Sequence, residues 1–240
     1  DTTVVKYCIE LGFSGFSDFK RSVTRYVKAR SAFAKHMEEN LASLNKGDAY
    51  SKVLENEINN IKKTAENPLN YDTFEKVLNE LNPSRKIYVM GVRSSELAAC
   101  YMAYILKEIG YQATHVTASS LNQYSYFLQM KPEDLLISFS FPRYAQDTVA
   151  CAKFAAEKGL TQITFTDSVI SPVAVYAKHV FLCEATTTYG IPSFLGVFEL
   201  INALITVCIQ RYPETTKKII QELDAFLSDK KIFWDSMEEE

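Results

Sequence analysis

The stretch DLLISFSFPRYAQDTVACAKFAAEKG, residues 134–159, contains the pattern that decides the fold. It begins with a short apolar run typical of a buried strand, and its second half has the spacing of a helix that ends at Gly159. The loop SFPRY (140–144) joins the two. A strand, a short loop and a helix start form a common anion-binding unit of α/β proteins, because free N–H groups at the helix N-terminus point at the ligand.

The same alternation of strand and helix patterns continues on both sides of this stretch. Short apolar runs rich in β-branched and aromatic residues occur at 86–90, 113–117, 134–139, 161–166 and 179–183. A helical pattern that also ends in glycine, SELAACYMAYILKEIG (95–110), follows the first run. Alternating strands and helices predict a parallel sheet covered by helices. We expect an α/β fold: a helical N-terminal arm, then a flavodoxin-like five-stranded parallel sheet in the order 2-1-3-4-5.

The N-terminal arm, residues 1–66, is predicted to be helical except at LGFSGFSDF (11–19). Ser17 is the expected N-cap of a helix that begins at Asp18. Further helices are expected from about Ala49 to the Asn67-Pro68 break, over 71–81, and over about 193–211. The last of these is apolar nearly all round, which predicts burial in the core or at a dimer interface.

The composition is that of a globular protein with a sizeable core. Of the 240 residues, 47% are hydrophobic and 23% charged. The five cysteines are scattered and never form a CxxC pair, which argues against a disulfide framework or a zinc site. No signal peptide is recognised, and the longest apolar run, 194–209, is too short and polar to cross a bilayer. We expect a cytoplasmic protein with no membrane contact, metal or cofactor.

The charge is distributed unevenly along the chain. Residues 1–35 hold seven Lys and Arg against three acids, whereas residues 214–240 hold eight acids against four Lys. A basic end suggests nucleic-acid contact, and a solvated helix face explains such a run equally well.

Two loops at predicted strand ends carry the candidate ligand site. In open parallel sheets, ligands bind outside the carboxyl ends of the strands, where the strand order reverses. The loops after the first and third strands flank that crevice, and each carries an arginine, which presents a fixed fork of donors to phosphate or carboxylate. The candidate ligand residues are Gly91, Arg93, Ser94, Ser95, Ser140, Arg143 and Tyr144. The alternative is that both arginines are ordinary surface residues.

Three segments, GVRSSELAACYMAYILKEIG, SFSFPRYAQDTVACAKFAAEKG and ITFTDSVISPVAVYAKHVFL, resemble the sugar isomerase (SIS) domain of RpiR-type bacterial transcriptional regulators. The N-terminal DTTVVKYCIELGFSGFSDFKRSV resembles the second half of that family's helix-turn-helix domain, from about the recognition helix onward. The resemblance implies a partial helix-turn-helix domain over 1–45, linker helices over 46–82, a SIS sugar-phosphate-binding domain over 83–212 and an acidic C-terminal tail over 213–240.

Both ligand loops depart from the family pattern. The usual first loop is Gly-x-Gly-x-Ser, and Arg93 replaces its second glycine. The usual second loop is Ser-x-Ser-Gly-x-Thr, of which only Ser140 remains; Pro142, Arg143 and Ala145 replace the second Ser, the Gly and the Thr. Because both loops gain an arginine, we expect an anionic sugar-like ligand, either a phosphosugar or a sugar acid.

The resemblance also assigns DNA contacts. It implies that Thr2, Thr3, Lys6 and Tyr7 face base edges or phosphates, and that Lys20 and Arg21 face the DNA backbone. The apolar residues Val4, Val5, Phe13, Phe16 and Phe19 are expected to pack together or on the remainder of that domain.

Together these features predict a transcriptional regulator that senses an anionic sugar metabolite through its SIS domain and thereby alters operator binding, as a homodimer or higher homo-oligomer. The alternative is an aldose–ketose sugar-phosphate isomerase, which needs a base near the substrate. His115, Glu96 and Glu199 are the candidates, whereas His36 and His179 lie away from the predicted crevice. We expect no catalytic residues. A purely structural protein would leave the two polar loops without a role.

Overall fold

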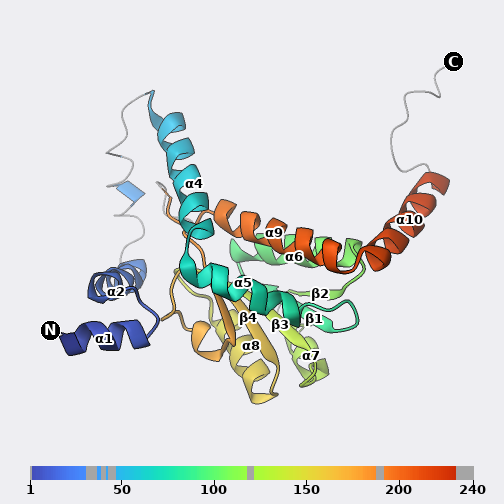
Figure 1. Cartoon of the computed structure of the whole chain (residues 1–240), viewed down its shortest axis with the longest axis horizontal. Helices are drawn as coiled ribbons and strands as arrows, with labels where there is room; N and C mark the ends of the chain where they lie inside the picture. Colours follow the sequence, from blue (N-terminus) through green and yellow to red (C-terminus); the bar gives the residue numbers. More distant parts are fainter. Residues whose placement is uncertain are drawn as a thin grey trace.

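A computed structural model describes residues 2–30, 37, 38, 42, 47–117, 122–187 and 192–230, and its centre is a parallel sheet (Figure 1). The strands are β1 (Lys86–Gly91), β2 (Gln112–Val116), β3 (Leu135–Ser140), β4 (Thr161–Thr166) and β5 (His179–Leu182). All neighbours pair in parallel, in the order β2-β1-β3-β4-β5. The predicted strands and their order are confirmed, and each boundary lies within one residue of its expected place.

Helices cover both faces of the sheet, because alternate residues of each strand point to opposite sides. Ile87 and Val89 pack in one cluster with α5 (Pro68–Glu80), α6 (Ser95–Glu108) and α9 (Leu195–Arg211). Tyr88 and Met90 pack in the other with α7 (Asn122–Gln129) and α8 (Gln146–Glu157). A short 3-10 helix, η1 (Ala174–Tyr176), lies between β4 and β5 in the chain. The expected three-layer α/β arrangement is therefore confirmed.

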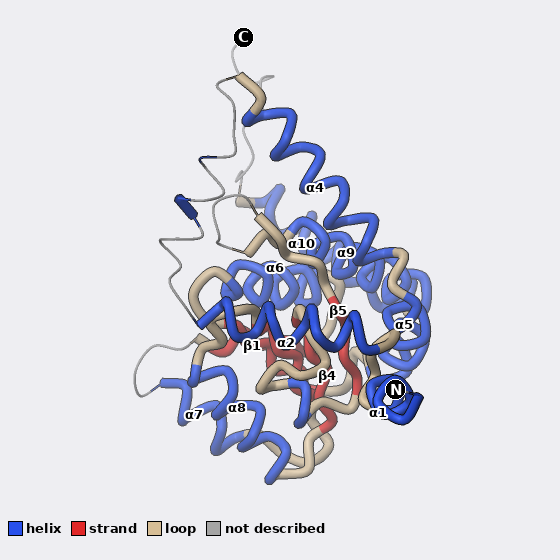
Figure 2. The backbone as a smooth tube through the Cα atoms, turned by 90° about the vertical axis from the view of Figure 1, so that its left-hand side faces the viewer, coloured by secondary structure: helices blue, strands red, loops and turns tan. Residues whose placement is uncertain are grey.

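The N-terminal arm begins with a pair of helices, α1 (Thr2–Glu10) and α2 (Phe16–Arg30), and Figure 2 shows α2 crossing in front of the sheet. Helix α2 begins at Phe16, so the prediction of Ser17 as its N-cap is wrong. The Asp18 carboxylate, not Ser17, holds this turn, because it accepts a hydrogen bond from the backbone N–H of Ser14 (3.0 Å). The sequence therefore predicted a helix here correctly but placed its first residue two positions too late.

The apolar side chains of the helix pair behave in two ways. Phe13 and Phe16 both contact Phe19, with ring centroids 5.3 and 6.4 Å apart. Val4 and Val5, in contrast, are 49% and 40% exposed, so their expected packing does not occur among the described residues.

Helix α4 (Ala49–Ala65) crosses α9 at very short range. A Cβ atom on Gly196 would lie only 2.6 Å from the Thr64 hydroxyl oxygen, so this crossing requires glycine. Helix α9 is buried along much of its length, as predicted. One of its few polar residues, Asn202, accepts a hydrogen bond through its side-chain oxygen from the Tyr101 hydroxyl (2.7 Å).

Side chains from α4 and α5 occupy the outer edge of β5. The Asn70 amide donates to the carbonyl of Leu182 (2.8 Å), and its oxygen accepts from the N–H of the same residue (2.7 Å). The Thr64 hydroxyl accepts from the N–H of Glu184 (2.9 Å). These bonds satisfy main-chain groups that an edge strand otherwise leaves unpaired.

A helix that the sequence analysis does not predict, α10 (Pro213–Asp229), occupies most of the segment expected to be an acidic tail. The Thr216 hydroxyl donates to the carbonyl of Ile109 (3.3 Å), and Gly110 lies against Thr215 and Ile219. Residues 231–240 lie outside the described residues. Among the described helices, none is long and apolar enough to cross a membrane by itself. Helices α9 and α10 reach that length and apolar composition only when they are taken together, and the chain bends by 100° between them.

An ion-pair cluster closes the amino-terminal end of the sheet. The Glu80 carboxylate accepts hydrogen bonds from Lys178 (2.7 Å) and Arg85 (2.8 Å) and lies 3.3 Å from a ring nitrogen of His179. Burial alone would raise the pKa of Glu80, but the hydrogen bonds from these three side chains outweigh it and lower that pKa to about 2. His179 therefore lies at the end of the strands opposite the ligand loops, as expected.

Candidate functional site

The first ligand loop turns tightly between β1 and α6. A Cβ atom on Gly91 would lie 2.4 Å from the carbonyl oxygen of Ser95, so only glycine fits where the strand ends. Ser94 is the N-cap of α6, but its side chain makes no capping hydrogen bond. Arg93 between them has φ of 60°, in the left-handed region of backbone space.

The second ligand loop has the same backbone feature. Arg143, between β3 and α8, has φ of 65°, and it and Arg93 are the non-glycine residues with positive φ in the described part of the chain. Both occupy positions where the resembled motifs carry glycine. A non-glycine residue in this conformation costs about 1–2 kcal/mol. The loops therefore keep a backbone shape suited to glycine while presenting an arginine at each position.

Residues of both loops line one small hollow of about 20 Å³. From the predicted set, it is lined by Arg93, Ser94, Ser95, Ser140 and Arg143. The prediction that the two loops meet in one crevice is confirmed by this geometry. Thr148 and Pro192 also line the hollow, although neither belongs to a loop motif recognised in the sequence. Thr148 lies in the first turn of α8, three residues after the lost threonine at Ala145, so it restores a hydroxyl to this helix start.

Ser140 is the most distinctive polar group in the hollow. Its side chain is 3% exposed, and its hydroxyl oxygen is buried without a hydrogen-bond partner among the described residues. A buried hydroxyl left without a partner costs about 1–3 kcal/mol, and a water, an ion or a ligand atom bound beside it would recover that cost.

The electrostatic character of the hollow favours an anion. Among the residues that the structure describes, its lining includes two arginines and no acidic residue. The helices α6 and α8 both begin beside it, and neither has a side-chain capping bond at its N-cap. Helix N-termini carry partial positive charge and free N–H donors. The arginine side chains are exposed, so they lie at the mouth of the hollow rather than inside it.

Two predicted ligand residues are not part of the lining. Gly91 shapes the first loop from outside the hollow. Tyr144 donates a hydrogen bond from its hydroxyl to the carboxylate of Asp167 (2.8 Å), just after β4. Tyr144 thus connects the second ligand loop to the end of the neighbouring strand.

The candidate bases occupy different environments. His115 lies on β2 opposite Val89, and its Nε2 is buried without a hydrogen-bond partner among the described residues. Burial lowers the pKa of His115, and the charge of Glu96 opposes that shift only in part. Glu199, on α9, has one buried carboxylate oxygen without a described partner, and burial raises its pKa. His36 lies outside the described residues.

The predicted DNA contacts are exposed on the helix pair. Thr2, Thr3, Lys6 and Tyr7 lie on α1, and Lys20 and Arg21 lie on α2. Arg21 forms an ion pair with Asp18 (2.9 Å). Among the residues that the structure describes, no group of three His, Cys, Asp or Glu side chains could hold a metal ion.

Comparison with known proteins identifies the sheet region. A family model described as "SIS domain" matches residues 80–207. A protein of Haemophilus influenzae named as an uncharacterised HTH-type transcriptional regulator is 28% identical over 185 residues, which are 76% of this chain and 63% of that protein. The chain thus spans less than two thirds of the length of this relative.

Solved structures share the fold. The sugar isomerase domain of the RpiR transcription factor from Sphaerobacter thermophilus has a TM-score of 0.71 and 27% identity, covering 74% of this chain and 99% of that one. The NanR protein of Vibrio vulnificus, solved in complex with ManNAc-6P, has a TM-score of 0.65 and 19% identity, covering 95% of this chain and 81% of that one. At that identity, the likeness to NanR is one of fold alone.

Proposed function

The chain belongs to the SIS domain family, and from that premise we propose that its strand-end hollow binds the anionic group of a sugar metabolite and that this binding regulates DNA contact by the N-terminal helix pair. The effector is a phosphosugar or a sugar acid. The regulatory role rests on the resemblance to RpiR-type regulators, which the named relative and the Sphaerobacter structure support.

The observation that carries the proposal is the unpartnered hydroxyl of Ser140 between two arginine-bearing loops. A hollow of about 20 Å³ has room for one water-sized group. One oxygen of a phosphate or carboxylate would therefore enter and accept a hydrogen bond from Ser140. The remaining oxygens would stay at the mouth, within the reach of Arg93 and Arg143, and the sugar would lie outside the hollow along the strand ends.

The proposal extends to the organisation of the whole regulator. Residues 1–45 would belong to the DNA-binding part, 46–82 to the connection and 83–212 to the sensor, with α10 packed on the sensor rather than free. Ligand binding can alter DNA affinity only if the ligand binds two global states differently. Operators are usually two-fold, so we propose a homodimer or higher homo-oligomer acting in the cytoplasm.

The proposal is tested by titration calorimetry with glucose 6-phosphate, gluconate and glucose. Replacing Arg93 and Arg143 together by Ala removes two charge-assisted contacts, and affinity for the bound anion should fall by about 100-fold or more. Ser140→Ala should cost about 10-fold. The exposed Ser125→Ala on α7 is the matched control and should bind normally. Affinity unchanged in the double arginine variant would refute the site.

A second function, sugar-phosphate isomerase, is favoured by one observation. Glu199 has a raised pKa and a buried oxygen without a described partner, and both are features of general bases. An isomerase would exchange the C2 proton of a bound aldose phosphate with solvent, which NMR in D₂O detects. If the wild type exchanges this proton and Glu199→Gln abolishes the exchange, the chain is an isomerase. If the wild type shows no exchange at saturating ligand, the isomerase is ruled out and the sensor function stands.

A further inference from the structure

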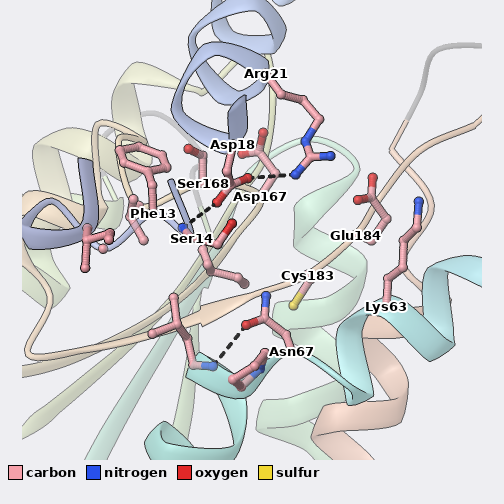
Figure 3. Close-up of a pocket in the computed structure, with 16 residues that line it drawn as sticks. Phe13, Ser14, Asp18, Arg21, Lys63, Asn67, Asp167, Ser168, Cys183 and Glu184 are labelled. Carbon is pink, nitrogen blue, oxygen red and sulfur yellow. Dashed lines mark hydrogen bonds and ion pairs between the residues drawn. The ribbon is translucent and has the colours of Figure 1, made fainter. Parts of the chain in front are cut away.

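A second and much larger cavity lies between the N-terminal helix pair and the strand ends (Figure 3). Its volume is about 650 Å³, within the range of roughly 300–1,000 Å³ typical of small-molecule sites. Four segments of the chain contribute to its lining: residues 9–21 of the helix pair, residues 63–69 at the junction of α4 and α5, residues 167–169 after β4, and residues 182–184 at the end of β5 and just beyond it. We refer to it as the inter-helix cleft.

The helix pair meets the sheet region beside this cleft. A Cβ atom on Gly12 would lie 3.6 Å from the side chain of Val169, so the turn after α1 lies close to the segment after β4. Across the cleft, Figure 3 shows Asp18 and Arg21 on the helix-pair side and Lys63 and Asn67 on the opposite side. A molecule in the cleft would therefore touch both the DNA-binding helices and the SIS domain.

The charge of the inter-helix cleft differs from that of the hollow. Three acids, Asp18, Asp167 and Glu184, face two bases, Arg21 and Lys63. Arg21 is already paired with Asp18 at 2.9 Å. Among the described lining residues, the cleft thus lacks the positive excess that attracts phosphate or carboxylate, whereas the described lining of the hollow includes two arginines and no acidic residue. The cleft suits a ligand that donates hydrogen bonds and carries no net negative charge.

The rest of the lining fits a carbohydrate ring. Ser14, Asn67 and Ser168 supply short polar side chains. Phe13, Val169 and Leu182 supply apolar surface. A sugar presents hydroxyl groups around its edge and C–H groups on its faces, so it can use both kinds of surface at once.

We propose that the inter-helix cleft binds a small polyhydroxylated molecule without net negative charge, a neutral sugar or an amino sugar, and that this molecule holds the N-terminal helix pair against the SIS domain. This second site goes beyond the anion site of the proposed function. Because its ligand contacts both parts, binding and docking of the helix pair are thermodynamically linked.

The test uses the full chain, with D-glucose and D-glucosamine as probes and inorganic phosphate as the anionic comparison. Calorimetry should detect both sugars, with glucosamine the tighter. Ser14→Trp places an indole in the cleft and should weaken both sugars by tenfold or more. Ser17→Trp is the matched control, since Ser17 is also exposed on the helix pair but does not line the cleft. Glu184→Gln should weaken glucosamine more than glucose.

Docking of the N-terminal helix pair on the SIS domain is monitored by amide hydrogen exchange. Saturating sugar should slow amide exchange over residues 8–19 in the wild type and in Ser17→Trp, but not in Ser14→Trp. The double Arg93 and Arg143 to Ala variant should keep this response, which separates the cleft from the hollow. The proposal is overturned if neither sugar binds at tens of millimolar, if phosphate alone slows exchange over these residues, or if Ser14→Trp binds both sugars as the wild type does.

Discussion

At the scale of single residues, the two left-handed arginines are the most informative feature of the molecule. Each holds a backbone conformation that glycine adopts freely, and each lies at the mouth of the hollow. Strain of this kind persists where the surrounding structure fixes it, and it is often found at binding sites. An arginine at position 93 or 143 therefore lowers the free energy of unfolding relative to glycine at the same position.

We predict that glycine is more stable than alanine at these positions. Arg93→Gly and Arg143→Gly should each exceed the corresponding Ala variant by about 1 kcal/mol in the free energy of unfolding, because Ala retains the positive φ. Urea denaturation measures the difference. At the exposed helical position Lys153 the order should reverse, with Ala favoured over Gly by about 1 kcal/mol. Equal Gly and Ala stabilities at both loop positions would contradict the assigned backbone.

A second residue-scale prediction concerns Glu80, whose pKa is lowered from 4.5 to about 2. A lowered carboxyl pKa stabilises the folded state above the unfolded pKa, and this contribution is lost as the pH falls through the folded value. Glu80→Gln should therefore cost on the order of 3 kcal/mol at pH 7, and the difference from wild type should shrink between about pH 4.5 and 2.

Urea denaturation at several pH values checks the Glu80 prediction. The matched control is Glu157→Gln, since Glu157 is exposed and lies 3.9 Å from Lys153. It should change stability by less than about 1 kcal/mol at any pH. A Glu80→Gln deficit that does not vary with pH would mean that packing, not charge, makes the contribution.

At the scale of elements, the strands were predictable because each is a short apolar run bounded by turn residues. The start of α2 at Phe16 was not predictable from capping preferences alone, because the Asp18 carboxylate accepts from the N–H of Ser14, a residue before the helix, and so does not act as an ordinary N-cap. Helix α10 was missed because its acidic charge dominates the pattern, while the packing of Thr216 on Ile109 depends on residues over a hundred positions away.

The same limit applies to the candidate site. The arginines and serines of both loops were visible in the sequence because motif position and strand order bring them together. Three features could not be predicted from the sequence, because each depends on how distant segments pack: the unpartnered hydroxyl of Ser140, the Tyr144–Asp167 hydrogen bond and the inter-helix cleft.

The side-chain pairing along β5 gives an element-scale prediction. Asn70→Ala should leave the N–H and carbonyl of Leu182 without their partner and reduce the free energy of unfolding by about 2 kcal/mol or more. Asn56→Ala removes one exposed bond to Thr186 and should cost no more than about 0.5 kcal/mol. Urea denaturation compares the two, and similar costs would show that Asn70 does not hold the strand edge.

At the scale of the whole molecule, the carboxyl end of the sheet is divided by charge. The loops after β1 and β3 form a positive hollow, and the ends of β4 and β5 border a cleft in which the described lining holds more acids than bases. The Tyr144–Asp167 hydrogen bond runs between these two regions. This one contact therefore connects the second ligand loop to the cleft beside the N-terminal helix pair.

The packing of α10 gives a prediction at this scale. A chain that ends at Tyr212 should unfold at a lower temperature and lose at least about 2 kcal/mol of stability, because Ile109 and Gly110 lose their contacts with α10. Differential scanning calorimetry measures the loss. The exposed Phe226→Ala within α10 should change stability by less than about 0.5 kcal/mol. An unchanged melting temperature on truncation would show that α10 contributes nothing to the domain.

The asparagine that pairs with β5 also limits how copies of this chain can assemble. Two sheets can merge into one continuous sheet when each presents a strand with unused main-chain donors and acceptors. At Leu182 those groups are already bound to Asn70 of the same molecule. Growth of the sheet from one subunit into the next is therefore blocked at β5, and a homo-oligomer that involves this side of the molecule would have to be held by helix surfaces.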